Sequence, residues 1–191
     1  MTPFRYDAET HTYYRQDGSV VPSITELLRR SGVVDAEWFT EVGRDRGTEV
    51  HNLTADFDLG ALTLDECLSP NKGFLAAHVQ LCQIARPKWE MIEQALVDQL
   101  GRFAGRPDRV GYWLGGDELL VADIKTGAAE KWHSLQTALQ AILVAPYFGV
   151  APASLKRYTI YYKKNGRYKV EEHVDLMDFN RALVLIQEFG A

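Results

Sequence analysis

The chain is poor in cysteine, with only Cys67 and Cys82 among its 191 residues. Two thiols in separate regions cannot supply the four cysteines of a zinc ribbon or an iron–sulfur cluster. Thiols stay reduced inside cells, so we expect both cysteines to be free in a cytoplasmic protein. The low cysteine content therefore predicts a protein without an iron–sulfur cluster.

Long apolar runs are also lacking. No run approaches the roughly 20 residues that cross a bilayer, and the opening MTPFRYDAET carries no apolar signal segment. We therefore expect no membrane partner and no secretion. Internal repeats and low-complexity linkers are missing as well, so residues 1–191 should form one domain with a sizeable core.

The sequence has no excess of positive charge, because its formal net charge is −5. This balance excludes a protein that coats nucleic acid through bulk charge. It does not exclude a nuclease, which needs clustered carboxylates for a metal and only a local basic rim for phosphates. With 46% hydrophobic and 25% charged residues, the composition is typical of a globular domain.

The first half of the chain has the patterns of a hairpin followed by helices. Residues 4–21 contain short aromatic runs divided by polar turns, which predicts a small hairpin. Ser23 is followed three residues later by Glu26, as in a capping box, which predicts a short helix that ends near Gly32.

Helical spacing of apolar residues then predicts two longer helices, over 36–57 and 73–91. Gly43 or Gly47 is expected to break the first, and Pro87 to bend or end the second. Residues 1–90 should thus form an N-terminal hairpin and helices.

The second half, residues 91–191, is expected to form a sheet with flanking helices. LLVA within 118–127 is apolar on both faces, which is typical of a central strand. Asn165-Gly166 is a strong tight-turn signal between two strands. The predicted class is α/β, an α+β mixed sheet flanked by helices. Its predicted elements are strands 92–100, 102–114 and 118–127, helix 132–149, hairpin strands 155–164 and 167–174, and helix 175–189.

A carboxylate and an ammonium lie together at the end of the predicted central strand. Asp123 and Lys125 are two residues apart and share a face, whereas Ile124 points into the opposite layer. An ionised carboxylate beside a core costs several kcal/mol unless something compensates it. An ion pair at a strand end is the simplest interpretation.

A second aspartate changes that interpretation. Asp108 lies on the preceding strand, and pairing the strands around a turn at 115–116 brings it opposite Asp123. Two close carboxylates repel each other unless a cation lies between them. The two aspartates and the backbone carbonyl of Ile124 would supply oxygen ligands for Mg²⁺ or Mn²⁺, with Lys125 orienting or activating the attacking water. Such a constellation suits phosphodiester hydrolysis, although Asp108 could instead cap a turn.

Pro107-Asp108 followed by Asp123-Ile124-Lys125 resembles the signature of the PD-(D/E)XK nucleases, closest to their phage and RecB-like exonuclease branch. Residues 11–28 resemble the N-terminal segment common in phage-encoded members, and 44–51 resemble an upstream glycine-and-histidine motif. Leu135-Gln136 matches the glutamine motif of the helix after the catalytic strand. The resemblance covers nearly the whole chain and implies a restriction-endonuclease-like core. Gln140 departs from it, because a tyrosine usually stands there.

The resemblance implies roles for particular residues. Asp108 and Asp123 would be metal ligands, and Lys125 the catalytic lysine. Glu93 would be an additional acidic ligand, although Glu90 or Asp98 could serve instead.

Two further roles are implied less directly. His51 would be a metal ligand or a phosphate contact, unless its role is structural. Gln136 would contact DNA or the active site, or make a structural hydrogen bond. We expect Trp132 and His133 to pack against the helix that they precede.

The activity implied by the resemblance is a Mg²⁺- or Mn²⁺-dependent DNA exonuclease acting on single- or double-stranded ends. It would serve phage recombination, replication or repair in the cytoplasm of a bacterial host, encoded by a phage or prophage. A single-strand-annealing protein and a second copy of the chain are the implied partners. The alternatives are an endonuclease of the same fold, an inactive nucleic-acid-binding module, and an α/β protein with an incidental ion pair.

Basic residues gather in two groups. Four arginines lie near the motifs and would hold phosphates or form ion pairs. A denser cluster with interleaved tyrosines lies on the late hairpin, and it fits either a nucleic-acid rim or an edge hairpin protected by lysines. The first group is Arg44, Arg46, Arg106 and Arg109; the second is Lys156, Arg157, Lys163, Lys164, Arg167 and Lys169.

Overall fold

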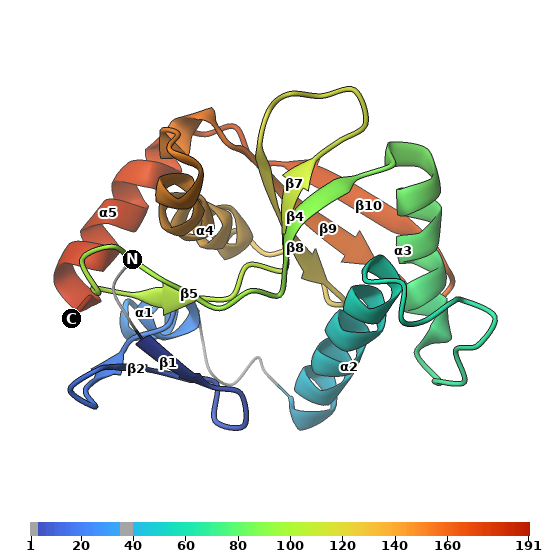
Figure 1. Ribbon diagram of the computed structural model, residues 1–191, viewed down its shortest axis with the longest axis horizontal. Coiled ribbons are helices and arrows are strands. Elements are labelled where there is room, and N and C mark those ends of the chain that lie inside the picture. Colours follow the sequence, from blue (N-terminus) through green and yellow to red (C-terminus); the bar gives the residue numbers. More distant parts are fainter. Residues whose placement is uncertain (1–3, 35–39) are drawn as a thin grey trace.

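The computed structural model describes residues 4–34 and 40–191, which form a mixed sheet with helices on both faces (Figure 1). The strands are β1 (Phe4–Asp7), β2 (Thr12–Arg15), β3 (Val20–Val21), β4 (Lys88–Ile92), β5 (Leu96–Val97), β6 (Ala104–Gly105), β7 (Arg109–Tyr112), β8 (Leu120–Lys125), β9 (Lys156–Tyr162) and β10 (Tyr168–Glu172). The helices are α1 (Ile24–Arg30), α2 (Glu41–Asp58), α3 (Lys72–Ala85), α4 (Trp132–Phe148), the short η2 (Pro152–Ser154) and α5 (Met177–Phe189).

The central sheet has the strand order β10-β9-β8-β7-β4. Only the β8–β9 pair is parallel, and α4 forms the crossover between these two strands. Helices α2 and α3 cover one face of the sheet, and α4 and α5 cover the other (Figure 1). The predicted mixed α/β class and the central position of β8 are therefore confirmed.

Strand β8 is apolar on both faces because each face meets a different core. Val121 packs in the core formed with α4 and α5. Ala122 and Ile124 pack in the core formed with α2 and α3. This alternation explains why the sequence of β8 reads as a continuous apolar run, and it places Asp123 on the α4 side.

Several local predictions are confirmed. The N-terminal hairpin forms and gains a third strand, β3. The Ser23 hydroxyl caps α1 by accepting a hydrogen bond of 3.1 Å from the backbone N–H of Glu26. The β9–β10 hairpin turns at Asn165-Gly166, with Tyr162 opposite Tyr168.

The predictions for 73–114 were partly wrong. Helix α3 ends at Ala85, because Arg86 takes a left-handed conformation with φ of 42° and Pro87 follows. Residues 88–91 are therefore strand, not helix. The two long strands predicted over 92–114 are broken, since Glu93 turns the chain with φ of 49° and β5 pairs with β6 in a separate small sheet.

Helix α2 was predicted with a break that does not occur. It runs unbroken through Gly43 and Gly47 from its cap at Thr40. Residues 36–39 of the predicted helix lie outside the described residues. Within the described parts of the chain, no helix combines the length and apolarity needed to cross a membrane.

The pairing of β7 with β8 sets the register of the acidic residues. Arg109 lies opposite Ala122 and Gly111 opposite Leu120, with the turn at Gly115 and Gly116. Asp108 directly precedes β7, and its carboxylate accepts a hydrogen bond from the backbone N–H of Ile124, so it lies in the region of Asp123, as predicted.

Candidate functional site

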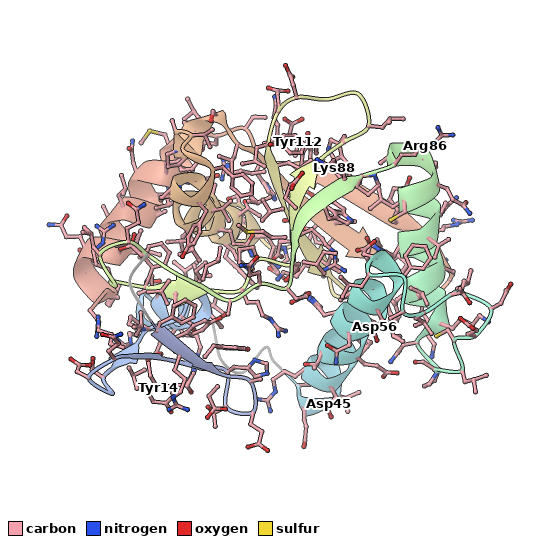
Figure 2. All side chains as sticks on the ribbon, viewed as in Figure 1. Tyr14, Asp45, Asp56, Arg86, Lys88 and Tyr112 are labelled. Carbon is pink, nitrogen blue, oxygen red and sulfur yellow. The ribbon has the colours of Figure 1, made fainter. Side chains whose placement is uncertain are left out.

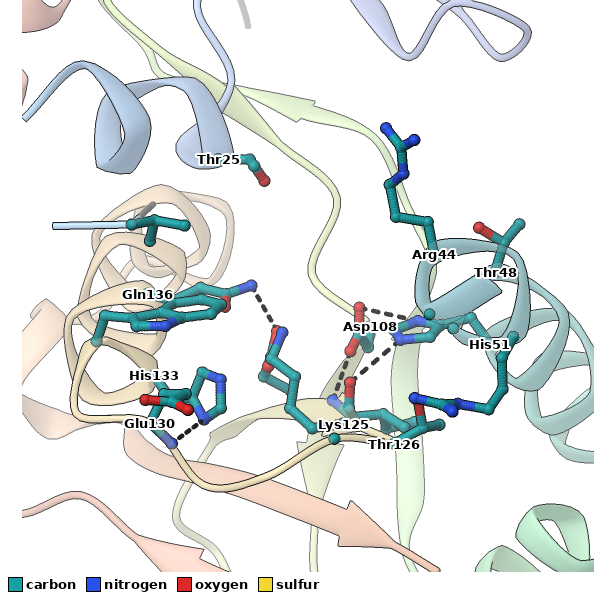
Figure 3. Close-up of a pocket in the computed structure, with 18 of the residues that line it drawn as sticks. Thr25, Arg44, Thr48, His51, Asp108, Lys125, Thr126, Glu130, His133 and Gln136 are labelled. Atoms are coloured by element: carbon teal, nitrogen blue, oxygen red, sulfur yellow. Dashed lines mark hydrogen bonds and ion pairs between the residues drawn. The ribbon is translucent and has the colours of Figure 1, made fainter. Parts of the chain in front are cut away.

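A cavity of about 600 Å³ opens where α2, α4 and the ends of β7 and β8 meet. In Figure 3, Arg44, Thr48 and His51 project from α2, and Gln136 projects from α4 on the opposite side. Asp108 and Lys125 lie between the two helices. The cavity thus brings together residues that lie up to 125 positions apart, from His11 to Gln136.

Three side-chain donors converge on one wall of this cavity. His51 Nδ1 lies 2.9 Å from Glu93 Oε1 and 3.3 Å from Asp108 Oδ1. On its other side, His51 Nε2 lies 3.1 Å from the carbonyl oxygen of Ile124. One donor atom from each of the three side chains lies within 4.8 Å of the others. Three of the predicted ligand side chains are therefore gathered at one point, whereas the Ile124 carbonyl lies beside the other ring nitrogen of His51.

The histidine supplies the positive charge in this cluster. Burial alone would lower the pKa of His51, but the carboxylates of Asp108 and Glu93 outweigh it and raise the pKa to about 10. Burial opposes ionisation of Glu93, yet His51, Arg106 and Arg109 hold its pKa below the ordinary value. The arrangement is an imidazolium between two carboxylates, and such carboxylates need a cation.

Glu93, rather than its acidic neighbours, belongs to the cluster. Glu90 is paired with Lys88 at 2.6 Å, and Asp98 is held by Arg102 at 2.8 Å. Neither Glu90 nor Asp98 lines the cavity, whereas Glu93 does. The left-handed turn at Glu93 directs its carboxylate inward after β4 ends.

Asp123 and Lys125 form the opposite side of the cluster. Lys125 Nζ lies 2.7 Å from Asp123 Oδ2, and both line the cavity. Asp123 Oδ1 accepts hydrogen bonds from Gln136 at 2.7 Å and from Gln140 at 3.0 Å. Asp123 does not join the donor group of His51, Glu93 and Asp108, so its role as a metal ligand stays a prediction.

Gln140 has a role that the sequence did not reveal. It stands where the resemblance leads one to expect a tyrosine, and it is buried against Asp123. Gln136 and Gln140 each leave their Oε1 without a hydrogen-bond partner among the described residues. Gln136 and Gln140 are four residues apart on α4, so both amides lie on one face of the helix. This spacing is the sequence signal from which their shared contact with Asp123 could have been predicted.

For Arg109, the structure supports the second of the two predicted roles, an ion pair. Its guanidinium is fully buried and donates to Asp58 Oδ2 at 2.6 Å and to the carbonyl oxygen of Asp108 at 2.7 Å. It also lies 3.4 Å from Glu93 Oε1. Arg109 therefore fixes the backbone that carries Asp108, and it is an ion-paired residue rather than a phosphate ligand.

The remaining arginines near the motifs lie around the cavity. Arg106 pairs with Glu93 at 3.1 Å, and Arg46 donates to the Thr126 hydroxyl at 3.3 Å. Arg44 is exposed at the cavity. All three arginines line the cavity.

The late hairpin fits the edge interpretation. Arg157 is buried against Asp178, and Tyr161 and Tyr162 belong to the core. Lys169 pairs with Glu171 on β10, which lies at the sheet edge. Residues 155–174 do not line the 600 Å³ cavity.

His133 and Trp132 pack as expected at the start of α4. The His133 ring hydrogen-bonds the Tyr161 hydroxyl at 2.9 Å. Burial and the charge of Lys125 lower its pKa to about 4, so it is neutral at pH 7. The Trp132 ring lies 5.4 Å from Lys125 Nζ, and it forms one wall beside the lysine.

No protein-family model matches the chain, and no curated protein does so either. Function is therefore inferred from the side chains themselves. An oxygen-rich donor group, an adjacent lysine and nearby arginines in one cavity can bind a divalent cation together with an anionic substrate.

Proposed function

We propose that this chain is a Mg²⁺- or Mn²⁺-dependent deoxyribonuclease of the PD-(D/E)XK type, and specifically an exonuclease that processes DNA ends. The observation that carries the proposal is the convergence of His51, Glu93 and Asp108 in the cavity that Lys125 also lines. An incidental ion pair between Asp123 and Lys125 would not require His51, Glu93 and Asp108 to meet beside it.

The donor set fits a hard divalent cation. Two carboxylates and a backbone carbonyl provide oxygen ligands, and the remaining sites can be filled by water. One imidazole nitrogen is compatible with Mn²⁺ as well. His51 already supplies positive charge at this point, so a cation that replaces its proton keeps the two carboxylates compensated.

The cation supplies charge neutralisation at the phosphate and a lowered pKa for a coordinated water. The chain's own contribution is positioning. Asp123 holds Lys125 Nζ at 2.7 Å, and the lysine is free to hydrogen-bond the attacking water or a phosphate oxygen. Gln136 and Gln140 in turn hold the Asp123 carboxylate from α4.

The substrate phosphates would be held at the rim of the cavity. Arg44 and Arg106 line it, and guanidinium groups bind phosphate oxygens in a bidentate geometry. A few arginines at the edge of the cavity would be enough to bind phosphates locally. A net charge of −5 over the whole chain is therefore compatible with DNA binding at this site.

The test is digestion of linear DNA labelled at the 5′ or 3′ end, single- or double-stranded, with Mg²⁺ or Mn²⁺. The wild type should release labelled nucleotides, and Lys125→Ala should lose this activity while still binding Mn²⁺. Closed circular DNA should stay intact, because an exonuclease needs an end.

Two outcomes would replace the proposal. Cleavage of closed circles would assign an endonuclease of the same fold. Retarded migration of DNA without cleavage under any of the divalent cations would assign a nucleic-acid-binding module instead.

A further inference from the structure

A second cluster of metal-type donors lies at the C-terminal end of α2 and on α3, outside the lining of the 600 Å³ cavity. Asp58 is the last residue of α2, and His78 and Cys82 lie one turn apart on α3. One donor atom from each residue lies within 4.8 Å of the other two. The proposed nuclease does not use these side chains.

The spacing of the three donor atoms matches a zinc site. Cys82 Sγ lies 3.5 Å from His78 Nε2 and 3.7 Å from Asp58 Oδ1. A tetrahedral ion with bonds of about 2.3 Å to sulfur and about 2.0 Å to nitrogen and oxygen places such atoms roughly 3.3 to 3.6 Å apart. The His78 Nε2 to Asp58 Oδ1 distance is 2.8 Å, so only this hydrogen bond must open.

The outer ends of two ligands are already fixed. His78 Nδ1 hydrogen-bonds the Tyr162 hydroxyl at 2.6 Å, which orients the ring with Nε2 toward the cluster. Arg109 Nε holds Asp58 Oδ2 at 2.6 Å, which leaves Oδ1 as the oxygen that faces His78 and Cys82. Partners of this kind orient the ligands of protein zinc sites and strengthen their binding.

A fourth position is open to solvent. A separate cavity of about 340 Å³ is lined by Asp58, Cys82, Arg86 and Trp89. Figure 2 shows Arg86 at the outer edge of the molecule, beyond the end of α3. An ion can therefore reach the cluster without passing the active-site cavity, and water or a small ligand can complete its coordination.

The thiol itself is not a reactive nucleophile in the metal-free protein. Burial and the nearby Asp58 carboxylate raise the pKa of Cys82 to about 12. A bound divalent cation deprotonates a coordinating thiol, and the proton is released to solvent.

We propose that Asp58, His78 and Cys82 form a binding site for Zn²⁺ or a similar borderline-soft divalent cation, with a fourth, exchangeable ligand from the adjacent cavity. The site joins the end of α2 to α3. Through Asp58 it also fixes Arg109, which contacts Glu93 and the Asp108 carbonyl. The rival interpretation is a purely hydrogen-bonded network with the same residues.

Cobalt titration of the full chain separates these interpretations, because Co²⁺ bound to a thiolate gives a charge-transfer absorption that oxygen and nitrogen ligands do not give. The wild type should develop this absorption with one equivalent of Co²⁺, and Zn²⁺ should abolish it by displacement. Cys82→Ser should lose it completely. Cys67→Ser is the matched control and should retain it.

Two further variants keep the test decisive. Asp108→Asn should retain the absorption, which shows that the site is distinct from the active-site donor group. Tyr162→Phe should weaken Zn²⁺ binding about tenfold, since it removes only the orienting hydroxyl. Absence of the absorption in the folded wild type, or its loss in Cys67→Ser, would overturn the proposal, whether or not the chain cleaves DNA.

Discussion

The Asp108 carboxylate accepts a hydrogen bond of 2.6 Å from the backbone N–H of Ile124. The carbonyl of the same Ile124 faces His51. One residue of β8 thus fixes two of the groups that would surround a cation. Because these contacts are made by backbone atoms, they hold the donor group together in the metal-free protein.

The first prediction concerns Asp108→Asn. The amide oxygen can still accept from Ile124, so the fold should be retained, but the site loses one negative charge. We expect Mn²⁺ affinity, measured by isothermal titration calorimetry, to fall about tenfold or more. Glu90→Gln is the matched control, because Glu90 pairs with Lys88 outside the cavity, and it should bind Mn²⁺ as the wild type does. Equal affinity of Asp108→Asn and wild type would contradict the assignment.

The second prediction concerns the pH dependence of stability in the metal-free protein. The folded-state pKa of His51 is about 10, against about 6.5 in an unfolded chain. The stabilisation from the imidazolium is therefore complete below pH 6.5 and is lost as the pH rises through 10.

Denaturant unfolding of wild type and His51→Gln, with a chelator present, measures this effect. The stability difference between the two proteins should be largest near pH 6 and should shrink as the pH approaches 10. A difference that stays constant over this range would show that His51 is not held as a cation.

The third prediction concerns Arg109→Met. The substitution leaves the Asp58 carboxylate buried without its guanidinium partner. Breaking a buried pair in this way costs about 3 to 5 kcal/mol in free energy of unfolding. Lys88→Ala breaks the exposed pair with Glu90 and should leave unfolding almost unchanged. Similar unfolding curves for the two variants would contradict the role given to Arg109.

The fourth prediction concerns two glycines with opposite surroundings. A Cβ at Gly111 would lie 2.1 Å from the carbonyl oxygen of Lys88, so Gly111→Ala should push β4 from β7 and destabilise the protein. A Cβ at Gly47, inside α2, meets nothing within 4 Å. Gly47→Ala should raise the free energy of unfolding by about 0.5 to 1 kcal/mol. Thermal unfolding of both variants checks the two signs.

Sequence patterns predicted those parts of the fold that depend on local signals. The alternation around Asp123, Ile124 and Lys125 predicted the correct faces of β8, and the turn at 115–116 predicted that Asp108 lies near this end of β8. Both follow from the two-residue period of a strand. The cap of α1 at Ser23 and the turn at Asn165-Gly166 were also predicted from local sequence signals.

The errors came from features without a local signal. The left-handed residue Glu93 ends β4, yet it is neither a glycine nor an asparagine. The contacts of Arg109 with Asp58 and Glu93 span long sequence separations, so no spacing rule could reveal them. Gln140 looked like a departure in the sequence and only its burial against Asp123 explains it.

The most direct test of the central claim is an anomalous difference map from a crystal grown with Mn²⁺. We expect one strong peak bounded by His51, Glu93 and Asp108, with Lys125 Nζ facing the same cavity. A map with no peak at this position at millimolar Mn²⁺ would contradict it.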